Sequence, residues 1–288
     1  MISDITLGQY FPGDSCIHKL DPRTKIILTV LFIVTVFLVN TPLGFLTILL
    51  SVISLILLSR ISIRVILKGV KPIIYVLIFT ALINLFMTKG ESQPLVDFYF
   101  IEIYKEGIIR AVFMALRVIL LIIGTSVLLT YTTSPISLTD GIESLLSPLK
   151  KIKIPVHVFA MMMTIALRFI PTLIEETEKI MNAQKSRGAD FSSGSLIKRA
   201  KALIPIIIPL FVSSFKRADE LAVAMECRCY RGDKNRTKLV KLEFRGRDYA
   251  WFGIGLVFLA AVIALMIIPS HITGILPETV YNVFFYKI

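Results

Sequence analysis

The chain has 288 residues, of which 55% are hydrophobic, and its mean hydropathy is +0.78. That apolar content is high for a water-soluble domain and favours a membrane protein. The net charge is +12, but basic residues alternate with apolar segments and no aromatic side chains interleave with them as on single-strand-binding surfaces. The expected partner of this charge is therefore the lipid bilayer and not nucleic acid.

The uncharged stretch between Lys25 and Arg60 is too long for one straight helix in a hydrocarbon core of about 30 Å. A turn signal at 40–44 divides it, which predicts a helical hairpin with spans near 25–40 and 43–59. Three more uncharged segments predict further spans, near 72–88, near 118–133 and over 249–270. Two shorter uncharged runs, 154–167 and 202–215, fit interfacial or buried helices better.

These segments predict an all-α membrane protein with about five transmembrane helices and a long helical segment outside the bilayer. Residues 1–133 would form an N-terminal membrane domain of four spans. Residues 134–248 would form a cytoplasmic domain, and residues 249–288 would form the last span and an outer tail. Lys and Arg concentrate before the first span, in the loop at 60–71 and in segment 140–248. The positive-inside rule then predicts a multi-pass cell-membrane protein with a cytoplasmic N-terminus and an outer C-terminus.

Two long helices are expected in the cytoplasmic segment, over about 155–187 and 196–229, with a serine-rich turn between them. Each begins apolar, becomes charged and ends in Ala-x-x-x-Arg, so that the two resemble weak repeats. They would form an antiparallel or crossed pair whose ends point apart. Two separated arginine tips indicate docking sites for two similar partners, although solvated helix-end charges would look the same in sequence.

Motifs of catalysis are absent from the sequence. No G-x-x-x-x-G-K-[ST] loop occurs, nor H-E-x-x-H or G-x-S-x-G. Cys227 and Cys229 form a C-x-C pair without a nearby histidine, which falls short of a tetrahedral metal site. We therefore expect no catalytic, cofactor or metal site in this chain. A self-contained channel or secondary transporter remains the alternative, and a membrane enzyme is a second one. Both would need polar or ionisable clusters within the spans, which four of the five lack.

The stretch Ser15-Cys-Ile-His-Lys-Leu-Asp-Pro-Arg-Thr-Lys25 resembles the opening of the transmembrane T component of energy-coupling factor transporters. Two arginine triplets, Ser186-Arg187-Gly188 and Cys227-Arg228-Cys229, resemble the motifs that end the coupling helices of that family. The likeness extends over most of the chain. In that family the T component is a scaffold for vitamin or metal uptake. It links two ABC-type ATPase subunits to a substrate-binding membrane subunit, the S component. The resemblance implies that ATP and magnesium are bound by the partner ATPases, and it leaves the choice of substrate to another subunit.

The resemblance also implies that Arg187 and Arg228 end two coupling helices and dock in acidic grooves of the ATPases. The second triplet departs from the pattern, because it lacks the glycine of the first and Arg231-Gly232 follows shortly after it. Arg231 is therefore an alternative to Arg228. The residues expected to support docking are Ala183, Ser186, Gly188, Ala224, Cys227, Cys229 and Arg231.

Overall fold

The computed structural model describes residues 10–87, 96–98, 101–153, 155–189, 191, 195–230, 232 and 242–272. Within these residues the chain is helical apart from β1 (Val96–Phe98) and β2 (Ile101–Ile103), which pair antiparallel and were not predicted. The chain divides into two compact units, each described by itself. The bundle unit comprises Gln9–Ser134 and Leu242–Ile288, and the helix-pair unit lies within Pro135–Lys241.

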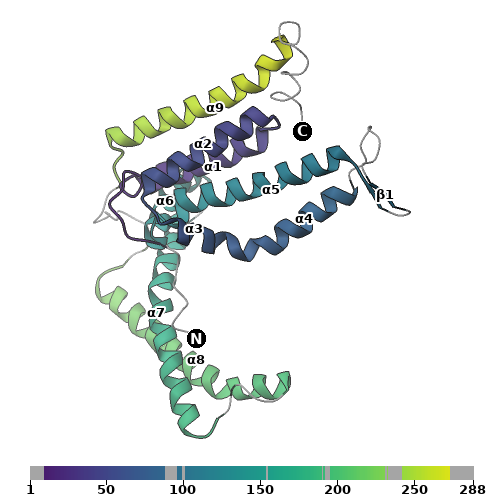
Figure 1. Cartoon of the computed structure of the whole chain (residues 1–288). Coiled ribbons are helices and arrows are strands. Elements are labelled where there is room, and N and C mark those ends of the chain that lie inside the picture. The colour runs from purple at the N-terminus through teal and green to yellow at the C-terminus, as the bar shows by residue number, and fades with distance from the viewer. Residues whose placement is uncertain are drawn as a thin grey trace. The chain divides into compact units, whose positions relative to one another are not determined.

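The bundle unit is a set of long apolar helices (Figure 1). Its helices are α1 (Pro22–Leu38), α2 (Pro42–Ser59), α3 (Ile63–Val70), α4 (Ile74–Met87), α5 (Lys105–Thr125) and α9 (Gly246–Ile272). A 3₁₀ turn, η1 (Lys71–Ile73), joins α3 to α4, and a π-helical turn, η2 (Ser126–Thr130), extends α5. Helix α5 packs against α1, α2 and α4, while α9 packs against α1 and α2.

The predicted hairpin at the start of the chain is confirmed. Helix α1 ends at Leu38 and α2 begins at Pro42, where the fixed backbone angle of proline suits a first helical residue. Thr41 caps α2, because its hydroxyl accepts a hydrogen bond from the Gly44 amide at 3.2 Å. Turn and helix start are thus both set by the few residues that interrupt the apolar run.

Apolar side chains line both the inside and the outside of the bundle. Phe32, Ile48, Leu120 and Val262 belong to a core that draws on four helices. Large apolar side chains on the outer faces of α2, α4 and α9 are nevertheless exposed. Leu57 on α2, for example, is 72% exposed. A water-soluble chain rarely leaves so much apolar surface uncovered, so these faces fit contact with lipid.

Among the residues that the structure describes, five helical segments are long and apolar enough to cross a membrane: Pro42–Ser59, Ile63–Met87, Gly107–Thr130, Val156–Ser186 and Gly246–Leu265. The count agrees with the prediction, but its membership differs. Helix α1, with 17 residues, is too short to be included. Val156–Ser186, expected outside the bilayer, is included by length and composition.

The predicted start of the fourth span, at residue 118, was wrong, because α5 begins at Lys105. Arg117 interrupted the uncharged run in the sequence, yet the structure accommodates it inside the helix. Its guanidinium donates to the Val39 carbonyl and, at 3.0 Å, to Asn40 Oδ1. An arginine that is paired with the turn of a neighbouring hairpin can remain within a long helix, so its charge did not mark the helix end.

A buried polar cluster joins the start of α1 to two distant parts of the chain. Lys25 is 2% exposed, and its ammonium donates to the carbonyls of His18 (3.2 Å) and Thr132 (2.8 Å). Asp248, also 2% exposed, accepts from the Asp21 amide at 2.9 Å. The turn before α1, the end of the α5 segment and the start of α9 are therefore fastened at one place.

The helix-pair unit contains α6 (Pro135–Leu146), a 3₁₀ turn η3 (Ser147–Ile152), α7 (Val156–Ser186) and α8 (Leu196–Cys227). Helices α7 and α8 begin and end within two residues of the two predicted long helices. A buried hydrogen bond at 2.9 Å joins His157 Nδ1 of α7 to Glu143 Oε1 of α6.

We expect Lys25→Met to lower the free energy of unfolding by about 3 kcal/mol, because the two carbonyls lose their donor where water cannot replace it. Lys19→Met is the matched control. Lys19 is half exposed and, among the described residues, its ammonium forms an ion pair only with an almost fully exposed Asp14, so its replacement should change stability by less than about 0.5 kcal/mol. Thermal unfolding of the purified chain in detergent measures both, and equal effects would contradict the role of the buried cluster.

Candidate functional site

Helix α7 ends in a hydrogen-bonded turn that places Arg187 at its C-cap. The Gly188 amide donates to the Lys185 carbonyl at 2.9 Å, and the Ala189 amide donates to the Gln184 carbonyl at 3.0 Å. Gly188 has φ +85°, in the left-handed region that glycine enters without steric cost. This pair of bonds is the Schellman arrangement that closes many helices.

Helix α8 ends in the same way, with Arg228 at the equivalent cap position. The Cys229 amide donates to the Glu226 carbonyl at 2.8 Å, and the Tyr230 amide donates to the Met225 carbonyl at 3.0 Å. The backbone angles of the two arginines nearly coincide, with φ −87° and ψ 9° at Arg187 and φ −89° and ψ 15° at Arg228. The weak sequence repeat is therefore a repeat of local structure.

The glycine missing from the second triplet belongs at the left-handed position, which Cys229 occupies with φ +58°. A side chain in this region costs roughly 1 kcal/mol or more, so α8 keeps the turn despite an unfavourable residue. This geometry makes Arg228, and not Arg231, the structural equivalent of Arg187. Arg231 itself lies outside the described residues.

Both arginines present their charge to solvent. They are exposed, as are Ala183, Ser186 and Gly188 around the first and Ala224, Cys227 and Cys229 around the second. Neither guanidinium makes a side-chain hydrogen bond or ion pair with any residue that the structure describes. Each helix end thus offers an unpaired, planar donor suited to a carboxylate on another molecule.

The two helices cross at equivalent positions of the repeat. Arg217 Nη2 on α8 lies 3.3 Å from Glu176 Oε2 on α7, and these residues are separated by the same interval as Arg187 and Arg228. Arg187 follows Glu176 along α7, and Arg228 follows Arg217 along α8. In both helices the interval is about three turns, or about 16 Å of helix. Figure 1 shows α8 crossing α7, with the end of α7 at the bottom of the view and that of α8 at the left. The two arginines therefore terminate two arms of similar length.

Helix α8 also carries a long exposed apolar face. Seven of its large apolar side chains are 43% to 63% exposed and recur at helical spacing. They are Leu203, Ile204, Ile207, Ile208, Phe211, Val212 and Phe215. An uncovered apolar stripe of this length is typical of a surface that another protein or lipid covers.

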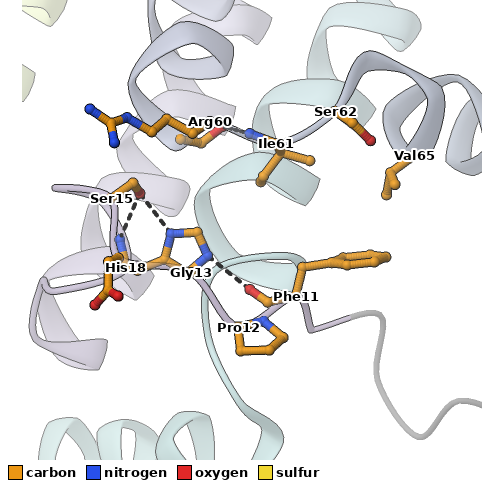
Figure 2. Close-up of a pocket in the computed structure, with 11 residues that line it drawn as sticks. Phe11, Pro12, Gly13, Ser15, His18, Arg60, Ile61, Ser62 and Val65 are labelled. Atoms are coloured by element: carbon orange, nitrogen blue, oxygen red, sulfur yellow. Dashed lines mark hydrogen bonds between the residues drawn. The ribbon is translucent and has the colours of Figure 1, made fainter.

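A pocket in the bundle unit lies between segment 11–18 and the turn at 59–65, with a volume of about 250 Å3 (Figure 2). Some of its polar groups bind one another: the His18 ring contacts Ser15 Oγ at 2.6 Å and the Phe11 carbonyl at 2.9 Å. No three His, Cys, Asp or Glu side chains converge on a metal-sized site in the part of the chain that the structure describes. The docking surface at the helix ends is therefore the stronger candidate.

Comparison with known proteins finds a match to the family model CbiQ, described as cobalt transport protein, over residues 13–239. The chain is 57% identical over 249 residues to the energy-coupling factor transporter transmembrane protein EcfT of Clostridium kluyveri, which covers 86% of this chain and 92% of the relative. The protein of the same name from Ruminiclostridium cellulolyticum is 55% identical over 265 residues (92% and 98%). The one from Bacillus subtilis is 48% identical over 263 residues (91% and 98%).

Replacing Gly188 by alanine tests the local geometry of the first tip. A Cβ there meets no atom within 4 Å, so the expected loss of about 1 kcal/mol comes from the left-handed backbone alone. Hydrogen exchange of the Ala189 amide should quicken about fivefold. The matched control is Gly253→Ala in α9, which also opens onto free space but has no positive φ. Cys229→Gly should slow exchange at Tyr230. Unchanged exchange in both Gly188→Ala and Cys229→Gly would contradict the assignment.

Proposed function

The chain belongs to the CbiQ cobalt transport protein family, and we propose that, like its relatives named above, it is the transmembrane T component of an energy-coupling factor transporter. In this role it is a scaffold without catalytic activity of its own. It links two ABC-type ATPase subunits to a substrate-binding membrane subunit, the S component, for uptake of a vitamin or a metal ion. ATP and magnesium belong to the ATPases.

The observation that carries this proposal is the equivalence of the two arginine caps. A scaffold that binds two similar ATPases needs two similar contact points, and Arg187 and Arg228 share cap geometry, exposure and distance from the helix crossing. We propose that each guanidinium enters an acidic groove of one ATPase. A buried arginine–carboxylate pair fixes orientation as well as affinity, because its hydrogen bonds are directional.

Helices of this length can carry movement over a distance. When ATP closes the two ATPases, the tips of α7 and α8 must move with them. The helix pair would then shift at its crossing, where Arg217 contacts Glu176. We propose that the exposed apolar face of α8 contacts the S component, so that this shift tilts the substrate-binding subunit.

The same proposal includes an orientation in the membrane. Helix α1 packs against α5 and α9, which are both apolar enough to span, so we place α1 in the bilayer with them despite its length. Helix α7 carries Glu175, Glu176 and Glu178 in its second half, and charges of this density are costly in hydrocarbon. We place it on the cytoplasmic side, with the N-terminus cytoplasmic and the C-terminus outside.

Removing the two arginines tests the docking. Each of Arg187→Ala and Arg228→Ala should weaken retention of ATPase subunits in mild detergent at least tenfold, because loss of one partner of a buried charge pair costs about 2 kcal/mol or more. The double variant should retain none. Co-purification of the two ATPases with each tagged variant measures the effect.

Two controls separate docking from general charge. Arg199→Ala removes an exposed arginine from the opposite end of α8, and Arg231→Ala tests the alternative docking residue. Both should retain the ATPases as the wild type does. A double variant that binds two ATPases and couples ATP hydrolysis to uptake normally would disprove the docking assignment. A wild-type chain that retains no ATPase would disprove the scaffold and favour a self-contained channel or secondary transporter.

A further inference from the structure

Four cations form a line along the connection between α2 and α4. Arg60 follows the last residue of α2, Arg64 and Lys68 lie on α3, and Lys71 begins η1. At 100° per residue, Arg64, Lys68 and Lys71 fall within about 60° of one another around the helix axis. These four residues, here named the cationic stripe, are all exposed.

Nothing in the described part of the chain neutralises the cationic stripe. None of its side chains makes an ion pair or hydrogen bond with a described residue. The sequence has no acidic residue between Asp21 and Glu91. The positive charge of this segment is therefore uncompensated by its neighbours in the chain, and it is free to attract anions.

The cationic stripe borders apolar side chains that are also exposed. Ile63 is 64% exposed and Leu67 is 61% exposed, and both lie next to the cations on the helix surface. A short helix with basic and apolar residues side by side is typical of one that lies in the interface plane of a membrane. Cations at such a place bind anionic headgroups, while the apolar side chains enter the acyl boundary.

The opposite face of α3 is held against the bundle. Ile66 is 3% exposed and packs with Val127 and Tyr131. Gly69 lies so close to Tyr131 that an added Cβ would be 2.3 Å from the tyrosine hydroxyl. Because α3 is fixed on this side, its exposed face is presented in one direction.

The alternative, in which Ile63–Met87 crosses the hydrocarbon as one rod, would place Lys68 and Lys71, two of its three cations, inside the hydrocarbon. A helix of 25 residues is about 37 Å long and exceeds a core of about 30 Å. With α3 in the headgroup layer, Lys68 and Lys71 stay out of the hydrocarbon, where charges are costly.

We propose that the exposed face of α3 is a binding surface for anionic phospholipids, with the cationic stripe on the headgroup phosphates and Ile63 and Leu67 among the acyl chains. The proposal needs only that the chain is a membrane protein, and it does not rest on the ATPase-docking assignment. It assigns to this segment a partner different from those of the helix tips.

The test uses the purified full-length chain in detergent, titrated with phosphatidylglycerol or with zwitterionic phosphatidylcholine, and bound lipid is counted by native mass spectrometry. Each cation near a headgroup contributes about a factor of five in affinity. Arg64→Gln with Lys68→Gln should therefore weaken phosphatidylglycerol binding on the order of 20-fold and leave phosphatidylcholine binding unchanged.

Two further variants complete the test. Lys179→Gln with Lys216→Gln removes two exposed cations that stand beside acidic residues on α7 and α8, and it should change lipid binding less than twofold. Arg64→Lys with Lys68→Arg keeps the charge and should bind as the wild type does. Undiminished phosphatidylglycerol binding by the glutamine variant would overturn the proposal, as would equal binding of the two lipids by the wild type.

Discussion

The buried Lys25 cluster is the constraint on which the rest of the structure depends. Chain segments enter and leave the helix-pair unit at about residues 134 and 242, and both connections meet the bundle unit beside this cluster. The Lys25 ammonium donates a hydrogen bond to the carbonyl of Thr132, just before the first connection. The Asp248 carboxylate, just after the second connection, accepts a hydrogen bond from the Asp21 amide. The guanidinium of Arg23 lies 4.0 Å from the centre of the Phe244 ring. The backbone beside both of these connections is therefore held within the bundle unit, at Thr132 and at Asp248.

The distal ends of the helix pair depend on backbone geometry more than on side-chain packing. The turn after each helix is closed by two amide-to-carbonyl bonds, and only the residue at the left-handed position differs between them, Gly188 in one and Cys229 in the other. The turn is thus kept at the end of α8 although Cys229 disfavours the left-handed backbone angle. In the proposed scaffold for two ATPases, this turn would set the direction in which each arginine meets its ATPase.

Much of the architecture could be predicted from the sequence, because hydrophobic runs and turn residues are local signals. The hairpin at Pro42 and the bounds of α7 and α8 followed from such signals. The start of α5 did not, because the partners that accommodate Arg117, Val39 and Asn40, lie far away in the sequence. The role of Cys229 was equally hidden, since a left-handed backbone angle at a residue other than glycine leaves no mark in composition. The docking role proposed for the arginines came from family resemblance, and the structure adds the equivalence of their geometry.

Site-specific photo-cross-linking tests the central claim most directly. A photoreactive residue is placed at Ser186 or at Cys227, the exposed positions that precede Arg187 and Arg228, in the assembled membrane complex. The account predicts that each position forms an adduct with one ATPase subunit and that a chain labelled at both positions captures two. Adducts with lipid or with the S component alone, at either position, would contradict it.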